Sequence, residues 1–288
     1  MQWERHRWLS EFSPLGIGGR IAYFASPSSR EEMGEGLFFA KEQALPLLII
    51  GRGSNCLFSD EGFPGVVLLN QMQRCSWDRN RVSVEGGYSF LRLGKEAARK
   101  GLGGLEFACG VPGSVGGAVY MNAGACGQET AHCLQSVRYM DGTGSEKEYK
   151  ANELQFSYRT SPFQKLDGVI LEALFQLREE EGAWEQQRAM IRYRLRTQPL
   201  RQKNIGSIFR NPLGQGAGRL IEQCGCKGHR IGDALVSPIH ANFIVNRGKA
   251  TAQEVYGLIR WVQDQVLEKK GISLELEIKL IGYHGVSC

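Results

Sequence analysis

Apolar and polar positions divide the chain into a strand-rich first part and a more helical last part. Apolar runs bounded by glycine, asparagine or charged residues predict strands at 44–50, 65–70, 81–87 and 168–177. Helical spacing of apolar residues predicts a helix over 88–101 that stops at a glycine. A charged segment at 178–187 then interrupts the pattern, and further helices are expected at about 183–197 and 217–224.

The clearest helical pattern covers residues 252–269. Thr251 precedes it as an N-cap, Glu254 completes a capping box, and Gly271 ends the helix. Its apolar stripe consists of Val255, Ile259, Val262 and Val266. The segment is therefore predicted to be an amphipathic helix packed on a core.

Strict alternation predicts a last strand over residues 274–281. One face carries Leu274, Leu276, Ile278 and Leu280, and the other carries Glu275, Glu277 and Lys279. The apolar face is assigned to the core. The charged face is either solvent-exposed, which is the default for such residues, or the wall of a cleft.

Composition and charge are those of an ordinary globular protein with an excess of glycine. The chain has 288 residues, 42% hydrophobic and 23% charged, with a net charge of +5. Basic residues are spread along the chain and densest at 188–203, so a nucleic-acid interface is not expected. A solvated face is the first interpretation of this segment, and a pocket for an anionic small ligand is the second.

Eight cysteines, at 56, 75, 109, 126, 133, 224, 226 and 288, raise the question of metal binding. The spacing of Cys224, Cys226 and His229 is not a common zinc pattern, so no metal is predicted and small buried thiols are expected. The charged opening MQWERHRWLSEF has no apolar core of a signal peptide, and no apolar run reaches the ~18 residues of a membrane span. We therefore expect reduced thiols in the cytoplasm and no membrane span.

Two glycine-rich stretches carry the strongest chemical signal. Residues 110–124 read GVPGSVGGAVYMNAG, without a charge, and residues 51–55 read GRGSN after a predicted strand. The longer stretch is too apolar for a solvated loop and has too many glycines for an ordinary core helix. Glycine lets several backbone N–H groups point into one concavity and lets a phosphate approach closely.

Neither stretch is a standard dinucleotide or mononucleotide fingerprint. GRGSNC has Cys56 where a third glycine belongs, GQGAGR at 214–219 has the wrong spacing, and no GxxxxGK[ST] occurs. The remaining interpretation is a diphosphate cofactor held by two separate glycine loops in one domain.

The motifs in this order resemble a known family. GxGSN, EFACGVPGSVGGAVYMNAGACG, FSYRTSPF (156–163), GSIFRNP (206–212), AGRLIEQCGCKGHRIGDALVSPIHANFIVN (217–246) and LELEIKLIG (274–282) are similar to those of bacterial UDP-N-acetylenolpyruvoylglucosamine reductases. The likeness covers roughly residues 45–282. The segment LGIGGRIAYFA departs from the opening segment usual in that family, which concerns only a local flavin contact.

This resemblance implies the fold, the cofactors and the reaction. The fold class is α+β, with an FAD-binding fold of the vanillyl-alcohol-oxidase (PCMH) type over residues 1–180, in two α+β subdomains, and a C-terminal α+β substrate-binding domain over 181–288. Through noncovalent FAD, NADPH would reduce the enolpyruvyl ether on UDP-N-acetylglucosamine to the lactyl ether in peptidoglycan precursor synthesis. We expect a cytoplasmic monomer of the shorter subtype, because residues 159–207 leave little room for the extra substrate-covering loop.

The resemblance also implies roles for single residues. It implies that the catalytic residues are Arg159 as carboxylate ligand, Ser207 as proton donor and Glu277, preferred over Glu275 because it precedes Ile278 and Lys279. It implies that the cofactor contacts are Gly51, Arg52, Gly53, Ser54, Asn55, Leu57, Gly110, Pro112, Gly113, Ser114, Gly116, Gly117, Asn122, Ala123 and Gly124.

Substrate contacts are expected at Tyr158, Asn211 and His240, with packing or structural roles open for Tyr158 and His240. Some of the arginines at 192, 194, 196 and 201, with Lys203, are expected to meet the UDP diphosphate, although a solvated helix face is an equal alternative. Two other functions remain open: a flavin oxidase of the same fold, and a non-enzymatic binder of anionic polymers.

Overall fold

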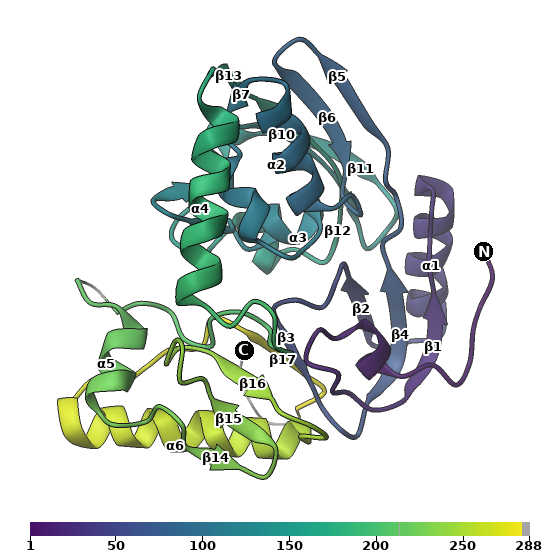
Figure 1. The fold of residues 1–288 in the computed structure, drawn as a ribbon. Helices are drawn as coiled ribbons and strands as arrows, with labels where there is room; N and C mark the ends of the chain where they lie inside the picture. The colour runs from purple at the N-terminus through teal and green to yellow at the C-terminus, as the bar shows by residue number, and fades with distance from the viewer. Residues whose placement is uncertain (213, 284–288) are drawn as a thin grey trace. The chain divides into compact units, whose positions relative to one another are not determined.

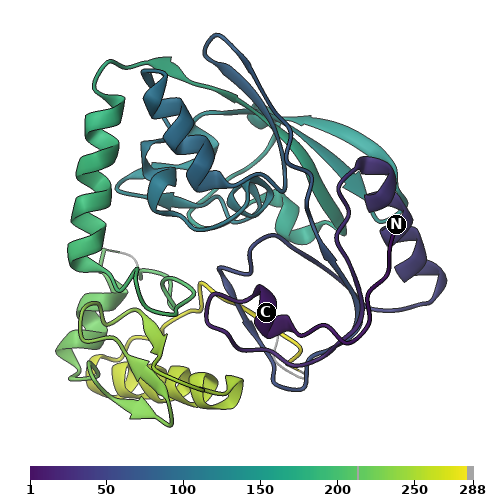
Figure 2. The ribbon, with the colours of Figure 1, turned by 45° about the vertical axis from the view of Figure 1, so that its right-hand side comes forward.

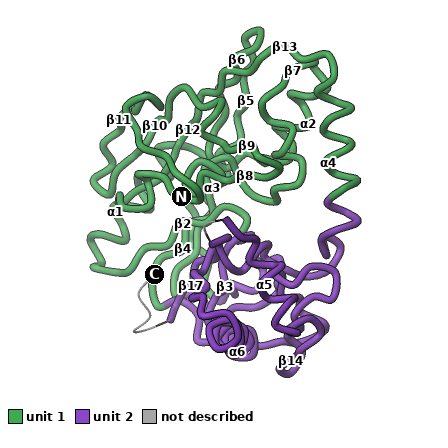
Figure 3. The backbone as a smooth tube through the Cα atoms, turned by 90° about the vertical axis from the view of Figure 1, so that its left-hand side faces the viewer, with its two compact units in different colours: residues 1–5, 22–52, 64–193 green, residues 6–21, 53–63, 194–288 purple. Residues whose placement is uncertain are grey.

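The computed structural model describes residues 1–212 and 214–283, which form two compact units. Unit 1 comprises residues 1–5, 22–52 and 64–193, and unit 2 comprises residues 6–21, 53–63 and 194–288, of which 213 and 284–288 lie outside the described residues (Figure 3). The chain thus passes between the units several times before the long helix α4 (Ala183–Thr197) carries it into unit 2 for the last time. Each unit has its own buried core.

The largest sheet of unit 1 is antiparallel and has five strands. Its order is β11 (Glu146–Lys150), β10 (Leu134–Asp141), β12 (Gly168–Gln176), β6 (Arg81–Glu85) and β5 (Cys75–Asp78). The helices α2 (Phe90–Arg99) and α3 (Val115–Tyr120) share its apolar core (Figures 1 and 2). The predicted strands at 81–87 and 168–177 and the helix at 88–101 are confirmed as β6, β12 and α2.

A second sheet of unit 1 has three strands, β1 (Ile21–Ala25), β4 (Phe63–Leu69) and β2 (Leu47–Ile50), with β2 parallel to β4. The predicted strands at 65–70 and 44–50 are confirmed, although the second begins only after Pro46. Two small ribbons, β7 (Leu102–Gly103) with β13 (Arg178–Glu179) and β8 (Gly124–Ala125) with β9 (Gln128–Glu129), complete the strands of unit 1.

Helix α1 (Arg30–Glu42), next to the three-stranded sheet, was not predicted. Its Ser29 cap accepts a hydrogen bond from the Glu32 N–H at 3.2 Å, and it buries Met33, Leu37 and Ala40. A β-carbon on Gly36 would lie 2.7 Å from the Leu68 Cδ1, so a glycine lets the helix approach β4. Because this glycine and Gly34 weaken the helical signal, the sequence alone did not reveal α1.

Unit 2 is built around helix α6 (Ala252–Lys270). This helix lies along the three-stranded sheet of β14 (Arg230–Ile231), β15 (Ala234–Val236) and β16 (Ile244–Asn246), and α5 (Ala217–Gln223) packs beside it (Figure 1). The predictions for both helices are confirmed, as is that for α4. Thr251 and Glu254 form the predicted capping box, Gly271 is left-handed at φ 67°, and the predicted apolar stripe is buried.

The predicted strand over 274–281 is wrong in extent. Only β17 (Lys279–Ile281) is a strand, parallel to β3 (Cys56–Phe58). Leu276 instead makes a single antiparallel bridge with Phe209, so the segment changes partners midway. The assignment of Leu274, Ile278 and Leu280 to the core is confirmed, since all three are buried.

The expectation that residues 110–124 have too many glycines for an ordinary core helix holds only for a long helix, because the stretch contains a short one. Residues 115–120 form α3, which buries Val115, Ala118 and Val119, and its two glycines are tolerated because the helix has only 6 residues. The remaining short turns of 3₁₀ helix are Leu9–Phe12, Glu106–Gly110, Thr130–His132, Ala151–Glu153 and Pro162–Lys165. No helix within the described ranges is long and apolar enough to cross a membrane.

Candidate active site

Part of the first glycine loop meets the second inside unit 1. Gly51 directly follows strand β2, and a β-carbon on it would lie 2.1 Å from the hydroxyl oxygen of Ser114. Ser114 caps α3 by accepting a hydrogen bond from the Gly117 N–H at 3.2 Å. Two sequence segments predicted to hold one cofactor are therefore in direct contact, and only a glycine fits at position 51.

The longer glycine stretch is held by the chain that precedes α2. The Phe90 N–H donates to the Gly113 carbonyl at 3.0 Å, and the Gly116 N–H donates to the Gly86 carbonyl at 2.8 Å. A β-carbon on Gly116 would lie 3.1 Å from that same carbonyl oxygen. Here glycine serves close packing between two backbones.

The loop of residues 53–55 offers unused donors in unit 2. Gly53 is left-handed at φ 58°, and a β-carbon on it would lie 2.2 Å from the Phe12 carbonyl oxygen. Within the part of the chain that the structure describes, the N–H groups of Gly53, Ser54 and Asn55 donate no hydrogen bond to another protein atom. Free N–H groups in a tight loop are the chemistry that binds phosphate oxygens, so the loop fits a diphosphate.

Leu57 and Asn122, two of the predicted cofactor residues, have side chains that are buried in contacts within the protein. Leu57 is fully buried in the core of unit 2, next to β17. Asn122 is fully buried at the end of α3, where its amide bonds to three protein groups. Contacts of these two residues to a cofactor would therefore come from their main chain.

Ser207 and Glu277 lie on two paired segments of unit 2. The Glu277 N–H donates to the Ile208 carbonyl at 2.8 Å, and the Arg210 N–H donates to the Glu275 carbonyl at 2.9 Å. This antiparallel register places Glu277 opposite Ile208, the residue after Ser207, and Glu275 opposite Arg210. Glu277 is half-buried whereas Glu275 is exposed.

The segment that carries Glu277 is also hydrogen-bonded to the first glycine loop. The Asn55 side chain donates to the Glu277 carbonyl at 3.1 Å, and the Lys279 N–H donates to the Asn55 carbonyl at 2.8 Å. A predicted cofactor residue thus fixes the backbone of the predicted catalytic glutamate.

A buried asparagine that sequence reasoning missed fixes the segment after Ser207. Asn242 is 3% exposed; its Oδ1 accepts from the Phe209 N–H at 2.9 Å, and its Nδ2 donates to the Phe209 carbonyl at 2.8 Å. Its main-chain carbonyl accepts from the Ile208 N–H at 2.9 Å. The only signal in the sequence is a polar residue inside the apolar run ANFIV.

Arg159 stands in a tight turn of unit 1. The turn is closed by two hydrogen bonds between the main chains of Ser157 and Thr160, of 3.1 and 2.9 Å. Arg159 has a left-handed φ of 55°, which is unfavourable for a residue with a side chain. Its guanidinium donates to the Gly124 carbonyl at 2.8 Å and lies 4.9 Å from the ring centroid of Tyr158.

The two remaining predicted substrate residues also have structural contacts. The Asn211 side chain accepts from the Ala217 N–H at 2.9 Å, at the start of α5. His240 packs on Gly218, and its Nδ1 accepts from the Asn242 N–H at 3.2 Å. Burial is the largest cause that lowers the pKa of His240, so this side chain is held in its neutral form.

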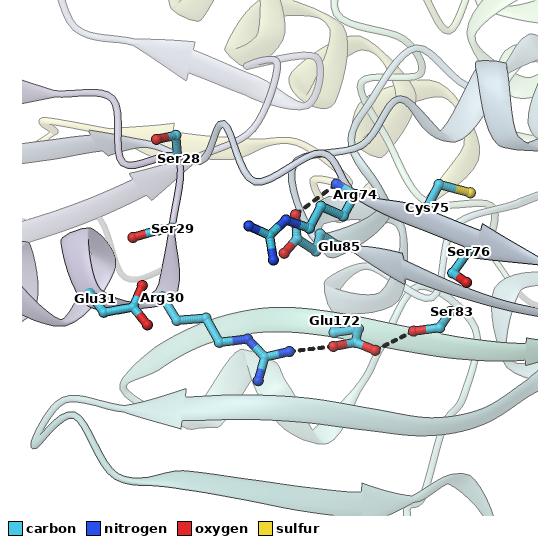
Figure 4. A pocket seen from close by; sticks show the side chains of 10 residues that line it. All are labelled: Ser28, Ser29, Arg30, Glu31, Arg74, Cys75, Ser76, Ser83, Glu85 and Glu172. Carbon is cyan, nitrogen blue, oxygen red and sulfur yellow. Dashed lines mark hydrogen bonds and ion pairs between the residues drawn. The ribbon is translucent and has the colours of Figure 1, made fainter.

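A separate polar cavity in unit 1, of about 330 Å³, contains none of the predicted residues (Figure 4). It lies between the start of α1 and the strands β5, β6 and β12. Arg30 on its wall pairs with Glu172 and, at 3.3 Å, with Glu146, and the Arg74 N–H donates to Glu85 at 2.7 Å. Much of its charge is neutralised internally, and we assign it no ligand.

Potential metal-ligating side chains do not cluster in the described residues. In residues 1–212 and 214–283, no three His, Cys, Asp or Glu side chains are arranged to hold a metal ion. None of the seven described cysteines forms a disulfide, Cys224 and Cys226 are buried, and Cys288 lies outside the described residues.

Comparison with known proteins gives matches over nearly the whole chain. Residues 21–149 match the model of an FAD binding domain, and residues 198–281 match that of the C-terminal domain of UDP-N-acetylenolpyruvoylglucosamine reductase. Among curated proteins, the UDP-N-acetylenolpyruvoylglucosamine reductase of Protochlamydia amoebophila is 46% identical, covering 98% of this chain and 95% of its own. That of Chlamydia abortus is 45% identical, covering 97% and 94%.

A solved structure of a UDP-N-acetylenolpyruvylglucosamine reductase, from Thermus caldophilus, is similar along the whole chain. Its TM-score is 0.84 at 37% sequence identity, covering 98% of this chain and 99% of that one.

Proposed function

The chain belongs to the UDP-N-acetylenolpyruvoylglucosamine reductase family, and we propose on that premise that it is an FAD-dependent UDP-N-acetylmuramate dehydrogenase. With NADPH as electron donor, it reduces the enolpyruvyl ether of UDP-N-acetylglucosamine to the lactyl ether, a step of peptidoglycan precursor synthesis. The predicted fold class, an FAD-binding domain of the PCMH type followed by the family's C-terminal domain, is confirmed.

The two glycine loops are proposed to hold the diphosphate of FAD without a covalent bond. The unused N–H groups of residues 53–55 and the contact of Gly51 with Ser114 support this role. FAD held by these loops would supply the hydride chemistry that links NADPH to the terminal carbon of the enolpyruvyl group. The other predicted contacts within 110–124 are kept as part of this proposal, and for Asn122 they would involve the main chain.

Three side chains are proposed to act on the substrate. Arg159 binds the carboxylate of the enolpyruvyl group with its guanidinium fork and stabilises charge that develops there. Ser207 donates a proton from its hydroxyl to the carbon next to that carboxylate, which completes the addition of a hydride and a proton across the double bond. Glu277 supports the polarisation of that double bond beside the serine.

The observation that carries the assignment of the acid–base pair is the backbone pairing of Glu277 with Ile208. It supports Glu277 over Glu275, because Glu277 lies opposite the residue that follows Ser207, whereas Glu275 lies opposite Arg210. The test of the proposed function is anaerobic: the bound flavin is reduced with NADPH, and UDP-N-acetylenolpyruvoylglucosamine is then added. Reoxidation of the flavin with formation of UDP-N-acetylmuramate supports the proposal, and a flavin that stays reduced refutes it.

Finer features are proposed on the same premise. Tyr158, Asn211 and His240 are kept as substrate contacts, and cations of 192–203 as contacts to the UDP diphosphate. Residues 1–180 are proposed as the FAD-binding region and 181–288 as the substrate-binding domain. We further propose a monomer of the shorter subtype that works in the cytoplasm, where nucleotide-linked precursors and NADPH are available.

Family membership also bears on the two alternatives. A flavin oxidase of the same fold would have a different C-terminal part, whereas residues 198–281 match the reductase-specific domain. The similarity to a reductase covers 98% of the chain, and this favours an enzyme over a non-enzymatic binder of anionic polymers. Neither alternative is retained.

A further inference from the structure

The end of the glycine-rich stretch and the turn of Arg159 are joined by side chains that the proposed chemistry does not use. Residues 120–124 end and follow α3, and residues 157–164 carry the turn and the short helix after it. Several polar side chains cross from one segment to the other within unit 1. Two of them are carboxamides: Gln164 bonds to groups of both segments, and Asn122, which belongs to the first, bonds to the second.

Asn122 holds the first residue of the turn. Its Nδ2 donates to the Ser157 carbonyl at 3.0 Å and to Glu129 Oε2 at 2.9 Å, and its Oδ1 accepts from the Ala131 N–H at 3.1 Å. Asn122 is fully buried and left-handed at φ 41°. A polar side chain that is buried with three satisfied hydrogen bonds has one defined orientation.

Gln164 holds Arg159 itself. Its Nε2 donates to the main-chain carbonyl of Arg159 at 3.0 Å and to that of Tyr120, in the last turn of α3, at 2.9 Å. The Ser161 hydroxyl donates to the same Tyr120 carbonyl at 2.7 Å. One amide group thus bridges the backbone of Arg159 to the glycine-rich segment.

These bridges act on a residue whose backbone conformation is unfavourable. The left-handed φ of 55° at Arg159 is a conformation that a residue with a side chain leaves unless its surroundings impose it. The Arg159 guanidinium closes the arrangement by donating to Gly124, two residues after Asn122. A turn held at its carbonyls and at its guanidinium presents that side chain in one geometry.

We propose that Gln164 and Asn122 are positioning residues for Arg159. The end of the 110–124 segment then holds the backbone of this arginine in place, in addition to its role at the cofactor. The functional part of this inference rests on the proposed role of Arg159 as the carboxylate ligand. Fixing the guanidinium that binds the substrate carboxylate contributes to the reaction rate, because displacement of such a group by about 1 Å can lower the rate about 100-fold.

The test uses Gln164→Met, which keeps the length of the side chain and removes both donors. The matched control is Gln187→Met, because Gln187 is a buried glutamine of the same unit that donates to the Gly94 carbonyl at 2.9 Å and contacts no residue of the turn. The full-length protein, loaded with FAD, is used throughout.

The first measurement does not depend on any activity. Trypsin cleaves after arginine, so release of the turn is followed by the mass of the fragments 1–159 and 160–288. Cleavage at this bond is expected to be about 10-fold faster in Gln164→Met than in the wild type, and unchanged in Gln187→Met. Equal cleavage in the wild type and Gln164→Met overturns the proposal.

The second measurement separates positioning from general loss of structure. In Gln164→Met, reoxidation of the reduced flavin by the UDP-enolpyruvyl sugar is expected to be about 100-fold slower, while reduction by NADPH stays within about 2-fold of the wild type. Equal slowing of both half-reactions overturns the positioning role. If the wild type itself is not reoxidised, the proposed function fails, and the cleavage experiment still decides whether Gln164 holds the turn.

A second variant covers the case in which Gln164→Met folds poorly. In Gln164→Glu, the protonated acid donates one hydrogen bond and the carboxylate donates none. An ordinary glutamic acid has a pKa of about 4.3, and partial burial against two carbonyl oxygens raises it, so the rate of flavin reoxidation relative to the wild type is expected to rise as the pH is lowered from 7 toward 5. A ratio that does not change with pH contradicts the proposal.

Discussion

Gly51 and Ser114 lie in contact although 62 residues separate them in the chain, and a β-carbon on Gly51 would lie 2.1 Å from the Ser114 Oγ. This contact links the end of β2 to the start of α3 within unit 1. It explains why a glycine is required at the end of an apolar strand. A substitution at Gly51 therefore tests the hypothesis that the two glycine loops hold one cofactor.

Gly51→Ala is expected to displace Ser114 and weaken the binding of FAD. Overpacking of this kind costs about 1–3 kcal/mol, which corresponds to a roughly 5- to 150-fold loss of affinity if it falls on the cofactor-bound state. FAD affinity measured by fluorescence titration of the apoprotein checks this. Gly142→Ala is the control, because its nearest neighbour, the Asp167 carbonyl oxygen, would lie 3.8 Å from the added carbon. Unchanged FAD affinity in Gly51→Ala would show that the loop adapts.

Ser207→Ala is expected to leave reduction of the flavin by NADPH intact and to slow its reoxidation by the UDP-enolpyruvyl sugar by about 10²- to 10⁴-fold. Only the second half-reaction needs a proton at carbon. Stopped-flow absorbance of the flavin measures the two separately. Ser273→Ala, an exposed serine of the same unit, serves as the control. The role of Ser207 is rejected if both half-reactions slow alike.

Glu277→Gln and Glu275→Gln form a matched pair. Glu277 pairs with Ile208 and is half-buried, whereas Glu275 pairs with Arg210 and is exposed. We expect the first substitution to slow reoxidation by about 10²-fold or more, and the second to stay within about 2-fold of the wild type. If Glu275→Gln slowed reoxidation more than Glu277→Gln, the family's catalytic glutamate would correspond to Glu275 and not to Glu277.

His240 predicts a pH dependence of stability. Burial lowers its pKa below the ordinary 6.5, so between the folded and unfolded pKa values the unfolded chain binds more protons. The contribution of His240 is therefore fully present above pH 6.5 and is lost as the pH falls toward its folded pKa. His240→Gln is expected to reduce the difference in unfolding free energy between pH 7.5 and pH 5.5, measured with urea. An unchanged difference would contradict this assignment.

Thr251→Ala is expected to destabilise unit 2 through the start of α6. The Thr251 Oγ1 accepts from the Glu254 N–H at 3.1 Å, and the Glu254 carboxylate accepts from the Thr251 N–H at 3.1 Å. Loss of this cap is expected to lower the free energy of unfolding by about 0.5–2 kcal/mol in urea titrations. Gln253→Ala, on the exposed side of the same turn, is expected to have no more than a few tenths of that effect. Equal effects of the two substitutions would argue against the cap.

Elements defined by neighbours in the sequence were predicted correctly. The helix after Thr251 is one example, because its cap, its apolar stripe and its terminal glycine all lie within one segment. Helix α1 was missed because its local signal is weak, and its stability comes from packing on β4, which is distant in sequence. The strand over 274–281 was predicted too long because alternation reports burial, and burial does not reveal which segment supplies the hydrogen bonds.

The sequence by itself determined the family and hence the chemistry. The motifs around Arg159, Ser207 and Glu277 each consist of neighbouring residues, so they can be identified without knowledge of the fold. Only the tertiary structure decided how those residues are held: the register that pairs Glu277 with Ile208, next to Ser207 in the chain, and the carboxamides of Asn122 and Gln164 that fix the turn of Arg159. The physical reason is distance along the chain. A cap or an apolar stripe forms among near neighbours, whereas a hydrogen bond between segments tens of residues apart exists only after folding has closed the chain between them.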